Sequence, residues 1–112
     1  MAFPFRFRSA LRDAQTDAIR VKAVRNALHS AIDAAQRERE GLSSRLADAQ
    51  VVAASLIGTD LEEKRTRRQA KALDEAESTL LTAGRRIAEL NEHIAALRDV
   101  EQFLNQRLPP LA

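Results

Sequence analysis

A heptad repeat of apolar residues runs through most of this chain and constrains its fold more than any other feature. Twelve of the fourteen a and d positions between Leu11 and Leu56 are apolar. A second repeat starts at Leu73 and has ten apolar residues among its eleven a and d positions. A period of about 3.5 residues gathers these side chains on one stripe of a helix, which must be buried against a partner stripe. The two repeats therefore predict two long helices, about 9–57 and 60–108, and we call their a and d positions the seam.

Two turn signals separate the predicted helices. Gly58 can close a helix C-terminus, because a residue without Cβ adopts the left-handed conformation without a clash. Thr59 and Glu62 match the capping box, in which a hydroxyl and a carboxylate satisfy backbone donors at a helix start. A stop and a start this close predict a tight turn at Gly58-Thr59. We therefore expect an all-α, long antiparallel two-helix coiled-coil hairpin, forming a single domain over residues 1–112.

The position of the turn also predicts which residues face each other. Residue i of the first helix would lie near residue 115 − i of the second, so that Leu28 meets Ile87 and His29 lies opposite Arg86. Polar residues within a coiled-coil seam commonly set its register. Arg25, Arg39 and Glu101 occupy such positions here.

Two glycines lie inside the predicted helices. The repeat keeps its phase across Gly41, which indicates a continuous first helix; the alternative is a break there, with a serine capping a new helix. Gly84 costs about 1 kcal/mol relative to alanine within a helix. We expect it to permit a close approach of the two helices beside Ala83.

Residues 1–8 are predicted to form a short arm outside the helices. Phe3, Phe5 and Phe7 alternate with basic residues, and Pro4 disfavours a helical conformation at the residue before it. Three interpretations remain open for this arm. It could dock on the nearest helices, bind a partner, or lie on a membrane surface.

The hairpin tip combines an apolar segment with a basic one. Residues 51–57 are apolar apart from Ser55, whereas residues 64–71 contain five basic residues. The apolar surface could be a loosely covered end, a protein-binding tip or a self-association site. The basic residues could be solvated, face an acidic protein, or bind nucleic acid, although the tip offers no stacking aromatic side chain. The candidate tip contacts are Val51, Val52, Leu56, Ile57, Lys64, Arg65, Arg67, Arg68 and Lys71.

Composition and motifs argue against an enzyme. The net charge of +2 comes from Arg6 and Arg8, and the chain has no cysteine. His29 and His93 would not meet in the predicted register, and no catalytic or phosphate-binding motif occurs. No signal peptide or membrane-spanning stretch is recognisable. We expect a cytoplasmic protein without enzymatic activity, cofactor or metal, which could associate peripherally with a membrane through a complex.

The opening sequence Phe5-Arg6-Phe7-Arg8-Ser9-Ala10-Leu11-Arg12, followed directly by a heptad helix, resembles the start of FliJ. FliJ is the small coiled-coil protein of the flagellar type III export apparatus, and the YscO-type stalk proteins are its injectisome counterparts. The resemblance implies a stalk whose joined N- and C-terminal ends enter the pore of the export ATPase ring. The remainder would reach toward the export gate and bind export chaperones. The terminal-end contacts would be Phe3, Phe5, Arg6, Phe7, Arg8, Phe103 and Arg107.

Two other functions are compatible with the same pattern. One is a stand-alone coiled-coil adaptor or a homodimer, in which two hairpins make a four-helix bundle. The other is a nucleic-acid-associated coiled coil that uses residues 64–71, which steeply salt-dependent DNA binding would reveal.

Overall fold

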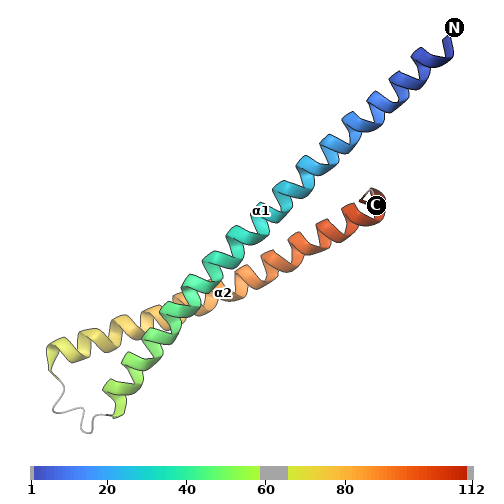
Figure 1. Ribbon diagram of the computed structural model, residues 1–112. Coiled ribbons are helices and arrows are strands. Elements are labelled where there is room, and N and C mark those ends of the chain that lie inside the picture. Colours follow the sequence, from blue (N-terminus) through green and yellow to red (C-terminus); the bar gives the residue numbers. More distant parts are fainter. Residues whose placement is uncertain (1, 59–65, 111–112) are drawn as a thin grey trace. The chain divides into compact units, whose positions relative to one another are not determined.

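The protein is a helical hairpin, as the two heptad repeats predict. A computed structural model describes the backbone of residues 2–58 and 66–110 and the side chains of residues 9–57 and 66–110. Helix α1 spans Ala2–Gly58 and helix α2 spans Arg67–Arg107, with no strand among the described residues. The contacts divide the chain into unit 1, Met1–Asp33 with Ala96–Ala112, and unit 2, Ala34–Ala95. Within each unit a segment of α1 packs against an antiparallel segment of α2 (Figure 1).

Helix α1 begins earlier than expected, so the prediction of a separate arm over residues 1–8 is wrong. The helix includes Pro4 and continues without interruption through Gly41, which confirms one continuous helix. Proline is tolerated in the first turn of a helix, because the backbone donors of that turn have no intrahelical acceptor. Pro4 therefore removes no intrahelical hydrogen bond, and the helix includes Phe3 despite the steric preference of the residue before a proline. The side chains of residues 1–8 lie outside the described ones.

Helix α2 begins later than expected, behind a different capping box. The Gln69 backbone N–H donates to Thr66 Oγ1 at 3.1 Å, and the Thr66 N–H donates to Gln69 Oε1 at 2.9 Å. This reciprocal pair makes Thr66 the N-cap, and it corrects the predicted start at residue 60. Thr66 and Gln69 follow the same pattern as Thr59 and Glu62, one heptad further along the chain. The earlier box lies outside the described residues.

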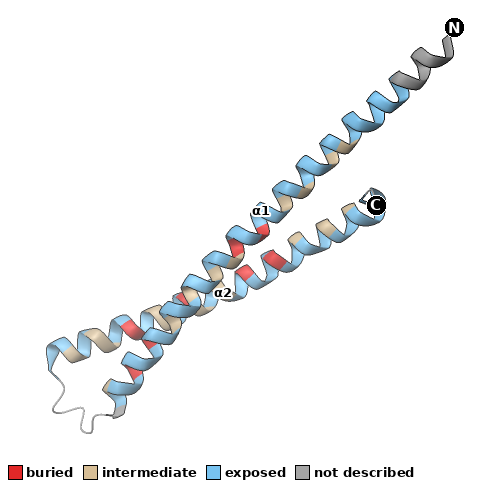
Figure 2. Cartoon of the chain, viewed as in Figure 1, coloured by how far each residue is buried: buried red, intermediate tan, exposed pale blue. Residues whose placement is uncertain are grey.

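The predicted seam is the buried face of both helices. Among the described residues, all eight buried apolar ones occupy a or d positions. Figure 2 colours the buried residues red along both helices. Five of the eight are alanines, and Leu90, at 1% exposure, is the large side chain that is most completely buried in the described part of the chain. The core is therefore narrow and rests on small side chains. The buried residues are Ile32, Ala35, Ala49, Ala53, Ala76, Ala83, Leu90 and Ile94.

The register predicted across the seam is wrong by about two heptads. In unit 1, His29 Nε2 lies 2.5 Å from Glu101 Oε2, whereas the predicted register placed His29 opposite Arg86. In unit 2, Arg39 contacts Asn91, far from its predicted partner at residue 76. The later start of α2 is the physical cause, because a longer connection moves every α2 residue relative to α1. When one helix is displaced by whole heptads, its a and d positions still face the a and d positions of the other helix. The apolar seam alone therefore does not reveal the displacement.

Polar residues within the seam make specific contacts across the two helices. In unit 1, Arg25 Nε donates to Asn105 Oδ1 at 3.0 Å, and its Nη2 donates to the Leu108 carbonyl at 2.7 Å. In unit 2, Arg39 Nη1 donates to Asn91 Oδ1 at 2.9 Å. The two arginines are two heptads apart in the sequence, and so are the two asparagines. A shift of one heptad would break both Arg–Asn bonds, which favours the observed register over its neighbours.

The glycine in the middle of α2 does not serve close helix packing, contrary to expectation. A Cβ placed on Gly84 would meet nothing within 4 Å. The position therefore carries the backbone entropy cost of glycine without a packing benefit.

We expect Gly84→Ala to raise the free energy of unfolding by about 0.5–1 kcal/mol, because alanine restricts the unfolded chain and fits the helix. Urea denaturation followed by far-UV circular dichroism measures this change. Ala88→Gly, at an exposed position one turn further along α2, is the matched control and should lose a similar amount. Destabilisation by Gly84→Ala would show that a close contact exists there.

Candidate protein interaction surfaces

The N-terminal part of α1 has no covering helix within unit 1. Every described residue from Ser9 to Asp17 is exposed, including Leu11 at 48% and Ala14. Both are seam positions that we expected to be buried, and the shifted register explains the difference. Leu11 would have faced Leu104 in the predicted register, whereas α2 ends close to Arg25, which bonds the Leu108 carbonyl. Figure 2 shows this stretch of α1 as continuously exposed.

The other terminal-end candidates with described side chains also face solvent. Phe103 is 63% exposed and Arg107 is exposed. The sequence suggested that the seam drifts toward Val100 and Phe103 at this end, but Val100 is exposed and Glu101 remains in the seam. The candidates Phe3, Phe5, Arg6, Phe7 and Arg8 belong to the helix, and their side chains lie outside the described ones.

Glu101 of α2 contacts His29 of α1 within unit 1. Glu101 Oε2 is removed from solvent and lies beside His29 Nε2. The contact is an ion pair when the imidazole is protonated. The described residues contain no group of three or more His, Asp or Glu suited to a metal ion.

The tip candidates of unit 2 expose both apolar and basic side chains. Val51 and Ile57 are 69% and 65% exposed, and Leu56 is half-buried. Arg67, Arg68 and Lys71 are exposed in the first turns of α2. Lys64 and Arg65 lie outside the described residues. Large apolar side chains beside exposed cations are the composition of a protein-binding rim.

A groove between α1 and α2 in unit 2 was not predicted from the sequence. Its volume is about 440 Å³, and its floor contains the buried alanines Ala49 and Ala76. Small residues in the seam, together with Ala72 and Thr79 at g positions of α2, leave this space open; g positions directly precede the a positions. Alanine at paired seam positions of both helices is the signal that could have revealed it. The remaining lining residues are Arg45, Asp48, Val52, Ala72, Glu75 and Thr79.

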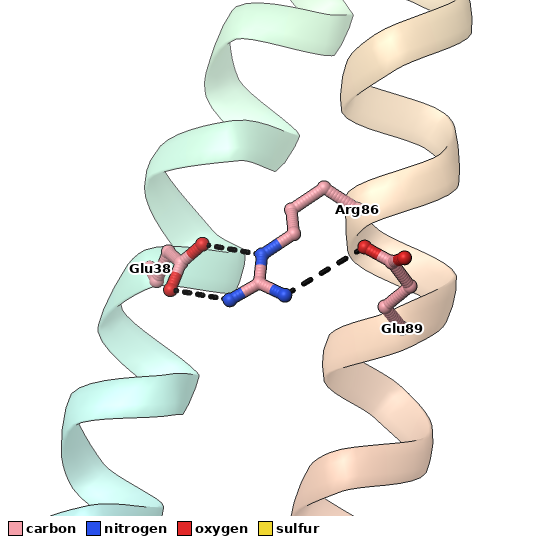
Figure 3. Close-up of polar contacts among 3 residues, drawn as sticks. All are labelled: Glu38, Arg86 and Glu89. Carbon is pink, nitrogen blue, oxygen red and sulfur yellow. Dashed lines mark hydrogen bonds and ion pairs between the residues drawn. The ribbon is translucent and has the colours of Figure 1, made fainter.

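An ion pair joins the helices on the g side of unit 2, the side on which Arg45 and Val52 line the groove. Arg86 Nε donates to Glu38 Oε2 at 2.8 Å and Arg86 Nη2 donates to Glu38 Oε1 at 3.2 Å (Figure 3). Arg86 Nη1 also lies 3.6 Å from Glu89 Oε1. The hydrogen bond from Arg86 lowers the pKa of the Glu38 carboxyl, and the same bond raises the pKa of Arg86. Both side chains are half exposed, so the pair orients the helices more than it stabilises them.

Comparisons with protein-family models, curated proteins and solved structures give no match to this chain. Within the described part of the chain, neither helix contains a stretch long and apolar enough to cross a membrane. The function must therefore be argued from the hairpin and its exposed surfaces.

Proposed function

We propose that this protein is a non-enzymatic, cytoplasmic coiled-coil stalk of a type III export apparatus, related to the FliJ and YscO-type proteins. Its terminal end would bind the export ATPase ring. The observation that carries the proposal is the uncovered N-terminal seam of α1, where Leu11 is 48% exposed. The resemblance to FliJ covers residues 5–12 and therefore overlaps this uncovered segment at residues 9–12.

Burial of the uncovered seam by a partner protein would be energetically favourable. Apolar surface removed from water contributes about 25 cal/mol per Å², and the heptad stripe of α1 continues beyond the end of α2. A ring pore lined by apolar side chains could bury Leu11 together with Phe103, which is 63% exposed. Arg12 and Arg107 are exposed and could meet acidic or backbone acceptors of the ring.

The tip would provide the second contact that a stalk needs. Val51 and Ile57 offer exposed apolar surface, and Arg67, Arg68 and Lys71 offer positive charge. This combination suits an acidic amphipathic segment of an export gate or chaperone.

The test is binding of the purified chain to the flagellar export ATPase, with ATP hydrolysis as a second measurement. We expect Leu11→Asp, Phe103→Ala and the triple change of Phe5, Arg6 and Phe7 to alanine to weaken binding by about tenfold or more, since central interface anchors each contribute 2 kcal/mol or more. Leu81→Ala is the matched control, because Leu81 is 77% exposed and belongs to unit 2. A wild-type chain that neither binds the ATPase nor stimulates its hydrolysis would refute the proposal.

A further inference from the structure

The α1 side of the unit 2 groove carries one cation and one anion, Arg45 and Asp48, and Glu75 adds a second anion on the α2 side. Arg45 occupies a g position and Asp48 the next c position, so both project on the groove side of α1. One cation and one anion on the same face can pair with the same two residues of a second copy. A two-fold interface has this property, because each contact between two different residues occurs twice.

The spacing along α1 extends this complementarity to the apolar residues. A two-fold axis across α1 between Leu46 and Ala47 places Arg45 of one copy opposite Asp48 of the other, because the two residues lie equally far from that point. Val52 and Gly41 are also equidistant from it. Val52 lines the groove and is 41% exposed, while a Cβ on Gly41 would meet nothing within 4 Å. The Val52 side chain of one copy would therefore fill the space above Gly41 of the other.

The narrow core gives a reason for such an association. Five of its eight buried residues are alanines, and Leu73 and Leu80, which pack against Ala49, Ala53 and Ala76, are only partly buried. A second hairpin on the groove would cover the exposed part of Val52 and the alanine floor, and complete a four-helix bundle.

We propose that two copies of this chain associate through the groove of unit 2, with their α1 helices antiparallel and Arg45 of each copy paired with Asp48 of the other. This inference goes beyond the proposed stalk function, since it uses none of the terminal-end residues. A dimer would leave Leu11 and Phe103 free for a further partner.

Sedimentation equilibrium across the micromolar range tests this proposal, and two adjacent valines provide matched variants. Val52→Arg should raise the dimer dissociation constant by about tenfold or more, because it places a long cation in the groove. Val51→Arg should leave the constant unchanged, since Val51 is 69% exposed and does not line the groove. Circular dichroism checks that both variants remain helical.

A charge exchange tests the pairing itself, independently of whether Val52→Arg folds well. Arg45→Asp and Asp48→Arg should each weaken the dimer, because each places like charges opposite one another. The double variant should restore wild-type association. A wild-type chain that stays monomeric, equal effects of Val51→Arg and Val52→Arg, or a double variant that is not restored would each overturn the proposal. A partner protein seated in the groove in place of a second copy would give the first of these results.

Discussion

Replacing Leu90 by alanine should lower the free energy of unfolding by about 2–5 kcal/mol, because the truncation removes buried apolar surface and leaves a cavity. Leu90 is 1% exposed and is the only described large side chain that the hairpin buries completely. Five of the eight described buried apolar residues are alanines, which have no rotatable side chain to fill a vacated space. The expected loss is a large fraction of the stability of a domain of this size. Urea denaturation at one fixed protein concentration measures it, since self-association would shift the midpoint.

Leu81→Ala is the matched control for this variant. Leu81 lies on the same helix and is 77% exposed, so the same substitution should change the free energy of unfolding by less than about 0.5 kcal/mol. Both variants keep helix propensity nearly constant, because leucine and alanine are both strong helix formers. Equal effects of the two substitutions would mean that α2 presents a different face to α1.

Enlarging a buried alanine should also destabilise the hairpin, by about 1–3 kcal/mol, because extra methylenes in a close-packed core force side chains or backbone to move. Ala83 is the best position for this test, since it is a seam residue with 4% exposure. Ala83→Leu adds three carbon atoms where two helices meet through small side chains. Thermal and urea denaturation should both show the loss.

Ala88→Leu is the corresponding control, because Ala88 is exposed on the same helix. Its expected change is within about 0.5 kcal/mol of zero. Stabilisation by Ala83→Leu would contradict the observed packing and indicate an unfilled space beside Ala83. The direction of the change therefore distinguishes a tightly packed alanine seam from a loose one.

The heptad pattern was sufficient to predict the helices and their buried stripe. Ile32, Ala49, Leu90 and Ile94 all occupy positions that the repeat assigns to the seam, and all are buried. The reason is local, because the spacing of apolar residues along a helix determines which side must leave water. Arg25 and Arg39 also behave as polar seam residues were expected to, since each bonds an asparagine of the other helix.

The heptad pattern did not predict the groove of unit 2. Its floor residues Ala49 and Ala76 were recognisable as seam positions, but their pairing depends on the register. The exposure of Leu11 has the same origin, since only the end of α2 decides whether that seam position is covered. The exposed state of Val51 and Ile57 follows more directly from the heptad pattern, because these residues occupy f and e positions outside the seam.

By itself, then, the sequence determined that this chain forms two helices with one apolar stripe each, because helix periodicity is a local property of neighbouring residues. Only the tertiary structure decided how those stripes are aligned. Two capping boxes, Thr59 to Glu62 and Thr66 to Gln69, compete for the start of α2, and a seam of repeating heptads is compatible with either. The capping bonds between Thr66 and Gln69 determine where α2 begins. The bonds from Arg39 to Asn91 and from Arg25 to Asn105 select one alignment, because the two form together only in that register. That selection leaves Leu11 uncovered in unit 1 and opens the alanine groove in unit 2.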